Sequence, residues 1–320
     1  MGQVILFACG GGVLSAMLFL SAAYGSPAAL IITHLTPLPL YLVGFSLGAA
    51  AAMVAGVVAV AVVGIVAGIP LGGAVLVAVA LPVVLLMRRA MTTEKPIAVE
   101  PIAAETPDPT VWCPPGPLLV LVCGYGVAMV AAAAVATMGQ PEGLAGAVGQ
   151  MVASRQALLA DFAGAETEVL TARLIAFAPG MLATGWLLAI VLNGTLGHWI
   201  VDRFGLSRRP ALAMSDVELP GWTVAVLAVL VGAAYLLDGQ IGYAARNLAV
   251  VVGLGFFFAG LGVVHALVRA SQSRPLLLAV FYGVLVLLGW TALIVAGLGV
   301  IEQWLGLRRR TASAGPEVED

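Results

Sequence analysis

The first 87 residues contain no Asp, Glu, Lys or Arg, which leaves few ways for this part of the chain to fold. A domain that folds in water carries about 25% charged residues. The whole chain of 320 residues is 62% hydrophobic and 9% charged, with mean hydropathy +1.09. Apolar runs of about 20 residues recur along it, and a helix of that length crosses the hydrocarbon of a bilayer. These features predict an all-α fold, a polytopic bundle of transmembrane helices.

Nine apolar segments predict about eight to nine membrane spans. The last one has 29 residues, about 44 Å of helix at a rise of 1.5 Å per residue, which is long for one crossing and short for two. A re-entrant bend near Gly289 would return the tail to the cytoplasm. The segments cover 4–23, 27–45, 46–68, 70–88, 116–138, 173–201, 220–237, 246–268 and 275–303.

A change of composition near residue 91 divides the chain. Residues 91–115 are rich in proline and carry charges, which favours an extended, semi-rigid linker. This linker separates an N-terminal bundle of about four spans, 1–90, from a C-terminal bundle, 116–305, and a polar tail follows at 306–320. Within the second bundle, residues 139–172 predict an amphipathic extracytoplasmic segment or an ordinary connecting helix.

Basic residues gather in the loops 88–117, 202–219 and 269–274. Cytoplasmic loops carry an excess of Lys and Arg. We therefore expect these three loops in the cytoplasm and residues 139–172 on the opposite side. The expected location is the inner membrane of a bacterial cell, with several crossings.

Two prolines interrupt the second segment within the sequence THLTPLPLY, which begins at Thr33. Pro37 and Pro39 lack an N–H, so the carbonyls that they free in hydrocarbon need other donors. Two interpretations stay open. The break opens a small polar cavity near the middle of the membrane, or it is a kink whose polar atoms neighbouring helices satisfy. In the first case His34, Thr33 and Thr36 are candidate solute-binding residues.

Two asparagines complete the candidate solute-binding set. Asn193 lies in the sixth segment and Asn247 opens the eighth, and a buried amide in hydrocarbon needs a partner on a neighbouring helix. His198 and Asp202 lie four residues apart on one helix face. They are interpreted either as an anchor at the membrane surface or as a proton-handling pair.

Small residues four positions apart recur in the N-terminal segments, and this spacing lets helix backbones approach closely in lipid. Packing within one bundle is the first interpretation. For the strip Ala8, Gly12 and Ala16, docking of another membrane subunit is the second. The residues predicted to serve helix packing or docking are Ala8, Gly12, Ala16, Gly44, Gly48, Gly64 and Gly68.

The sequence has no phosphate-binding GxxxxGK[ST] loop, no HExxH, no GxSxG and no paired carboxylates inside a span. We therefore expect no enzyme activity, no cofactor and no metal. Cys9, Cys113 and Cys123 form no metal-binding spacing and are expected to fill apolar space. No basic patch indicates a nucleic-acid partner.

Two resemblances to known families follow from particular motifs. The stretches LNGTLGHWIVDRFG, ARNLAVVVGLGFFFAGLGVVHALV and LGVIEQWLGLRRR resemble the YybS-like family of bacterial multi-pass membrane proteins, at Asn193, Asn247, Gly260 and the Gly299–Arg308 run. The resemblance implies no biochemical function. The first ninety residues are similar to the S components of energy-coupling-factor transporters, which bind substrates and dock a coupling subunit. This second resemblance implies that Ala8, Gly12 and Ala16 form the docking face.

Two functions are consistent with these features. The first is a transport-related membrane protein that binds a small neutral or weakly charged solute without an ATPase of its own. Its partners would be the lipid bilayer and either a membrane coupling subunit or further copies of itself. The second is a non-transporting scaffold that recruits envelope or division proteins. Both functions require a protein that is integrated in the membrane.

Overall fold

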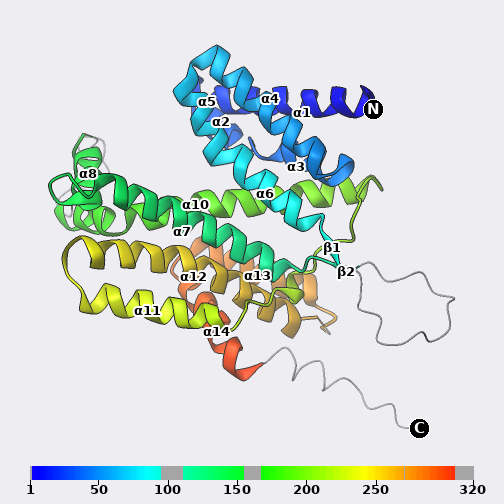
Figure 1. Ribbon diagram of the computed structural model, residues 1–320. Coiled ribbons are helices and arrows are strands. Elements are labelled where there is room, and N and C mark those ends of the chain that lie inside the picture. Colours follow the sequence, from blue (N-terminus) through cyan, green and yellow to red (C-terminus); the bar gives the residue numbers. More distant parts are fainter. Residues whose placement is uncertain (1, 95–110, 155–166, 270, 307–320) are drawn as a thin grey trace, which may run out of the picture. The chain divides into compact units, whose positions relative to one another are not determined.

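The computed structural model describes residues 2–94, 111–154, 167–269 and 271–306 and is helical in nearly all of them (Figure 1). Two compact units account for these residues. Unit 1 holds Met1–Pro114 and Leu188–Leu212, and unit 2 holds Pro115–Leu187 and Ala213–Asp320. One long helix, α10 (Thr167–Arg203), supplies residues to both. The units thus follow a different division from the two consecutive bundles expected from composition. The predicted linker, the predicted segment 139–172 and the predicted tail lie partly or almost wholly outside the described residues.

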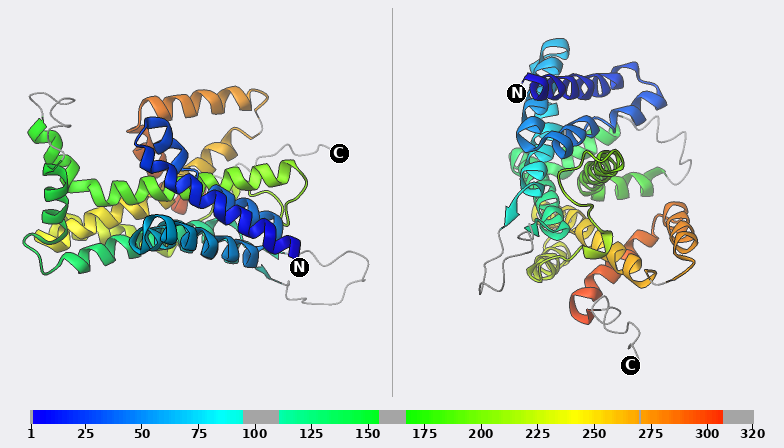
Figure 2. Two further views of the ribbon diagram at one scale, coloured as in Figure 1. Left: turned by 90° about the horizontal axis from the view of Figure 1, so that it is seen from above. Right: turned by 90° about the vertical axis from the view of Figure 1, so that its right-hand side faces the viewer.

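Unit 1 contains the N-terminal helices and the last part of α10 from Leu188 onward. Figure 2 shows the N-terminal helices, coloured blue to cyan, and α10, coloured green, from two further directions. In order they are α1 (Gly2–Leu20), η1 (Ser21–Tyr24), α2 (Pro27–Thr33), α3 (Leu38–Leu47), α4 (Ala49–Ala67), α5 (Ile69–Val75), the π-helical turn η2 (Leu76–Ala80), α6 (Leu81–Ala90), and the paired antiparallel strands β1 (Thr93–Glu94) and β2 (Val111–Trp112).

Unit 2 is built around α12, against which α7, α11 and α14 pack. Its elements are α7 (Pro115–Thr137), α8 (Gly143–Ala153), the first part of α10, η4 (Met214–Asp216), α11 (Trp222–Leu236), α12 (Gly239–Leu267), α13 (Arg274–Leu287) and α14 (Thr291–Leu305). At the crossing of α12 and α14, a Cβ on Gly260 would meet the carbonyl oxygen of Val295, and one on Gly299 would meet that of Phe256. Glycine at both positions therefore lets the two backbones touch.

Seven helical stretches of the described chain are long and apolar enough to cross a membrane. The pair α13 and α14 bends by 120° at its break and adds an eighth if it forms one span, so the bend expected near Gly289 is confirmed. Helix α11, with 15 residues or about 22 Å, is shorter than the hydrocarbon core. The polytopic all-α fold is confirmed. The seven stretches are Gly2–Tyr24, Pro27–Leu47, Ala49–Ala67, Ile69–Ala90, Pro115–Thr137, Thr171–Arg203 and Gly239–Leu267.

Glycine residues with positive φ lie at several helix ends. Gly25 adopts φ +63° after η1, and the hydroxyl of Ser26 then accepts a hydrogen bond from the N–H of Ala29, capping α2. Gly48 and Gly68 have φ values of +103° and +97° and separate α3 from α4 and α4 from α5. Their expected role in packing the faces of continuous helices is therefore corrected: both are junction residues, and the positive φ favours glycine.

The small-residue strip of α1 faces α4 within unit 1. Ala8 and Ala16 are buried, and a Cβ on Gly12 would collide with the carbonyl oxygen of Ala55. Because α4 covers this strip, Ala8, Gly12 and Ala16 serve packing within unit 1, as the first interpretation has it, and docking of another subunit there stays a prediction. Two further glycines also lie at close helix approaches, Gly44 against Met87 of α6 and Gly64 against Gly72 of α5.

Candidate functional site: the break in the second span

The break between α2 and α3 lies near the middle of the span Pro27–Leu47. Pro37 lacks the N–H that would reach the carbonyl of Thr33 four residues earlier. That carbonyl instead accepts hydrogen bonds from the N–H of Thr36, at 3.1 Å, and from its hydroxyl, at 2.6 Å. The carbonyl of Leu35, which Pro39 would leave free, accepts from the N–H of Leu38 at 2.9 Å. Tight local turns thus satisfy the carbonyls that the prolines free.

Neighbouring helices of unit 1 satisfy the other carbonyls of the break. The Ser15 hydroxyl on α1 donates to the carbonyl of Thr36 at 2.7 Å. The Asn193 amide on α10 donates through Nδ2 to the carbonyl of His34 at 2.8 Å. The hydroxyls of Ser21 and Thr33 lie 3.2 Å apart, which links the start of η1, directly after α1, to the end of α2. The break is therefore tied by hydrogen bonds to α1 and α10.

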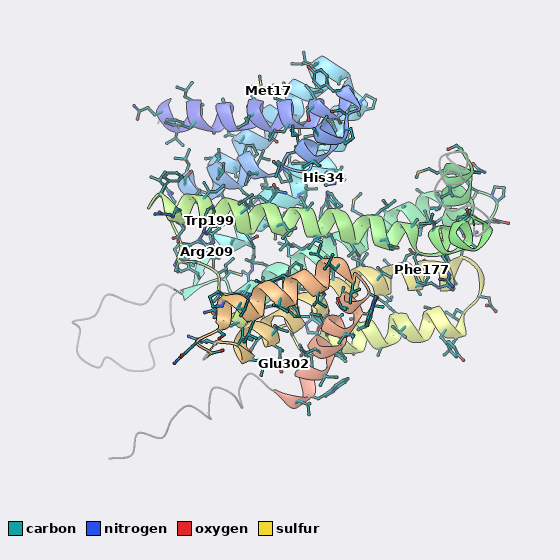
Figure 3. All side chains as sticks on the ribbon, turned by 180° about the vertical axis from the view of Figure 1, so that it is seen from behind. Met17, His34, Phe177, Trp199, Arg209 and Glu302 are labelled. Carbon is teal, nitrogen blue, oxygen red and sulfur yellow. The ribbon has the colours of Figure 1, made fainter. Side chains whose placement is uncertain are left out.

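The structure brings together some of the residues predicted to bind a solute and places the others elsewhere. Thr33, Thr36 and Asn193 come together at the break, with Thr36 and Asn193 buried. His34 joins them through its backbone carbonyl, whereas its side chain is exposed; Figure 3 labels it. Asn247 belongs to unit 2.

One polar atom at the break has no partner among the described residues, the carboxamide oxygen Oδ1 of Asn193. The residue is only 4% exposed. Its Nδ2 donates to two carbonyls, those of His34 and Ala189, both at 2.8 Å. This fixes the orientation of the amide, because a flipped amide would set Oδ1 against two acceptors. A buried acceptor without a donor loses about 1–3 kcal/mol of hydrogen-bonding free energy, which a ligand donor would restore.

Tyr41 on α3 is a further polar side chain that packs against α10, next to the residue that follows Asn193. A Cβ on Gly194, the next residue of α10, would lie 3.3 Å from Cζ of Tyr41 and 3.6 Å from its hydroxyl oxygen. Tyr41 is buried, and its hydroxyl makes no hydrogen bond within the described part of the chain. Sequence reasoning missed Tyr41; the available signal was a tyrosine two residues after Pro39 in a mostly apolar helix.

Asn247 and Tyr243 hydrogen-bond the backbone of α10 around a second proline, Pro179, in unit 2. Pro179 lies inside α10, and the Tyr243 hydroxyl donates to the carbonyl of Ile175, which Pro179 leaves free, at 2.6 Å. Asn247 accepts from the N–H of Gly180 at 2.8 Å and donates to the carbonyls of Ala176, at 3.1 Å, and Tyr243, at 2.9 Å. Its amide bridges a donor and an acceptor of α10. Asn247 is thus fully used in helix packing, which argues against a solute-binding role for it.

His198 and Asp202 do not form an ion pair among the described side chains. His198 is buried and stacks on Phe45, with ring centroids 4.5 Å apart. Its Nε2 lies 3.2 Å from the Ser207 hydroxyl and 3.3 Å from the carbonyl oxygen of Arg209, whereas Asp202 is exposed. His198 therefore holds the loop after α10 against the helix.

Arg209 ties the same loop to the rest of unit 1. Its guanidinium donates to the carbonyls of Ala90, at 2.9 Å, and Cys113, at 3.2 Å, and lies over the Trp112 ring, 5.8 Å from the centroid. Burial lowers the pKa of the Arg209 guanidinium. An arginine side chain stays protonated in proteins, so the group remains charged at neutral pH. Figure 3 labels Arg209 and Trp199 at the same end of α10.

A comparison with known families gives one match. The model of a family described as "Predicted membrane protein (DUF2232)" matches residues 116–302, more than half of the chain. No curated protein and no solved structure matches the chain. The match agrees with the YybS-like resemblance and does not reach the first ninety residues, so the likeness to S components is not shown. The chain belongs to the DUF2232 family of predicted membrane proteins.

Proposed function

We propose that this chain is a transport-related integral membrane protein that binds a small uncharged solute at the break between α2 and α3. The observation that carries the proposal is the buried Oδ1 of Asn193, which accepts no hydrogen bond from the described residues. A solute with an N–H or O–H group would supply the missing donor. The Tyr41 hydroxyl, beside Gly194, would offer a second contact.

The charge distribution supports an uncharged solute. Residues 1–87 carry no Asp, Glu, Lys or Arg, and Asp202 and Arg203 stand at the exposed end of α10. A charged group near the bilayer centre costs about 2.5–3.5 kcal/mol on insertion scales, and no opposite charge stands ready to offset it. The protein would bind the solute without changing it chemically, in a bacterial inner membrane. The sequence contains no nucleotide-binding motif, so the energy for transport would come from a separate coupling subunit or from an ion gradient.

Thermal unfolding of the purified chain tests the proposal, with a panel of neutral metabolites that carry N–H or O–H donors. A ligand at 100 times its Kd stabilises the folded state by about 2.7 kcal/mol. We expect Asn193→Ala to weaken binding about tenfold to a hundredfold, the equivalent of one buried hydrogen bond. Asn247→Ala is the matched control, since it removes a buried amide of unit 2 and should lower stability while leaving solute binding intact.

Uptake assays in deletion and complemented strains give the second readout. We expect one solute of the panel to accumulate less in the deletion strain and in the Asn193→Ala strain. No change in uptake or stability across the panel would count against transport.

A non-transporting scaffold is the second candidate, and one observation favours it. The carbonyls of Thr33, His34, Leu35 and Thr36 all accept hydrogen bonds from within unit 1, as in a kink that serves packing alone. In that case Asn193→Ala would change stability without changing uptake. Crosslinking would then capture an envelope or division protein on the intact chain.

A further inference from the structure

Five arginines gather at one end of unit 1. Arg88 and Arg89 lie in the last turn of α6, Arg203 ends α10, and Arg208 and Arg209 follow in the loop. The loop is bound to the other elements at this end, because Arg209 donates to the carbonyl of Ala90, the last residue of α6, and Arg208 to that of Ser46 in α3. All except Arg209 are exposed. Among the described side chains, no carboxylate pairs with any of them.

The loop that carries Arg208 is positioned by the end of α10. Gly205 adopts φ +68°, and the N–H of Leu206 reaches back to the carbonyl of Val201 at 2.9 Å, which closes the helix in a Schellman turn. The N–H of Arg208 then donates to the carbonyl of Phe45 at 3.2 Å. The loop backbone is therefore fixed against α3.

One of the three nitrogens of the Arg208 guanidinium donates a hydrogen bond within the protein, and the other two are available to a ligand. Its Nε donates to the carbonyl of Ser46 at 3.1 Å. The amino groups Nη1 and Nη2 make no hydrogen bond within the described residues. Two N–H groups in a fixed plane match a phosphate, which arginine binds in a bidentate manner.

Large apolar side chains flank this arginine cluster. Trp199, Phe204 and Leu206 are 63%, 74% and 61% exposed. Tryptophan is enriched where the hydrocarbon meets the headgroups. Side chains of this kind beside free guanidinium groups match a molecule with acyl chains and an anionic phosphate.

We propose that this end of unit 1 is a binding site for an anionic phospholipid. The headgroup phosphodiester accepts hydrogen bonds from Arg208 and lies beside Arg203, and the acyl chains contact Trp199, Phe204 and Leu206. Each arginine near an anionic membrane surface contributes about 1 kcal/mol, or about fivefold in affinity.

Native mass spectrometry of the intact chain tests the site, with phosphatidylglycerol and phosphatidylcholine of identical acyl chains. We expect wild type to retain phosphatidylglycerol more strongly. Arg203→Gln, which removes an exposed side chain without a described hydrogen bond, should weaken phosphatidylglycerol binding about fivefold. Arg208→Gln should weaken it at least as much, because the held guanidinium is lost. Arg274→Gln, which removes an exposed arginine from unit 2, is the matched control and should leave binding unchanged.

Three results would overturn the proposal: equal retention of the two lipids, unchanged binding in both Arg203→Gln and Arg208→Gln, or an equal loss in Arg274→Gln. In a further measurement, inorganic phosphate at about 10 mM is added as a competitor for the bound phosphatidylglycerol. Failure to displace phosphatidylglycerol supports a site for the whole lipid, and complete displacement contradicts it. None of these outcomes depends on the solute proposed at Asn193.

Discussion

At the scale of single residues, side chains satisfy the backbone groups around prolines at two places in the chain. Asn193 and Ser15 reach carbonyls beside Pro37, and Tyr243 and Asn247 reach groups around Pro179. In hydrocarbon no water satisfies such groups, so the nearest side chains must do so. Asn193 differs from Asn247 in one respect: its Oδ1 has no described partner.

The role of Tyr243 leads to a test by double substitution. Tyr243→Phe should lower the free energy of unfolding by about 1 kcal/mol, because the carbonyl of Ile175 loses its donor. Pro179→Ala supplies a backbone N–H for the same carbonyl. In the Pro179→Ala background, the effect of Tyr243→Phe should therefore shrink towards zero in a detergent unfolding titration. An equal effect in both backgrounds would contradict the assignment.

At the scale of the helices, small residues determine where backbones meet. Gly12 of α1 meets the carbonyl of Ala55 in α4, and Gly260 and Gly299 bring α12 and α14 together. Lipid gives no hydrophobic drive for helix association, so this close packing carries much of the stability. Glycines with free space around them, such as Gly10, have no such role.

Gly10 and Gly12 therefore form a matched pair of variants on one helix. Gly12→Ala should lower stability by about 1–3 kcal/mol, because its Cβ collides with backbone that cannot move aside easily. Gly10→Ala should be neutral or slightly stabilising, since nothing lies within 4 Å of its Cβ. Thermal unfolding in one detergent compares the two. Similar losses in both variants would show that α1 does not pack on α4 through Gly12.

Sequence reasoning predicted the membrane class and most helices, because span length and hydropathy depend on local composition. It also found the break at Pro37 and Pro39, since proline has a fixed effect on a helix. It could not find which carbonyl each donor reaches. That choice depends on contacts between residues far apart in the chain, such as Asn193 with His34. For the same reason the sequence left two interpretations open for the strip at Gly12, and the position of α4 favours packing within unit 1.

At the scale of the whole molecule, we expect the chain to cross the membrane with its basic loops in the cytoplasm. The exposed positions Thr92 and Ala211 belong to the loops expected there, and Gln140, also exposed, follows α7 on the expected outer side. Helix α7, with 23 residues or about 35 Å, is long enough to separate Thr92 from Gln140.

Single-cysteine labelling with a membrane-impermeant maleimide measures this arrangement directly, in a background where Cys9, Cys113 and Cys123 are replaced by alanine. The account predicts that a cysteine at position 140 reacts in intact cells. Cysteines at 92 and 211 should react only after the membrane is permeabilised. Equal reaction at 92 and 140 in intact cells, or release of the protein from membranes by alkaline carbonate, would contradict it.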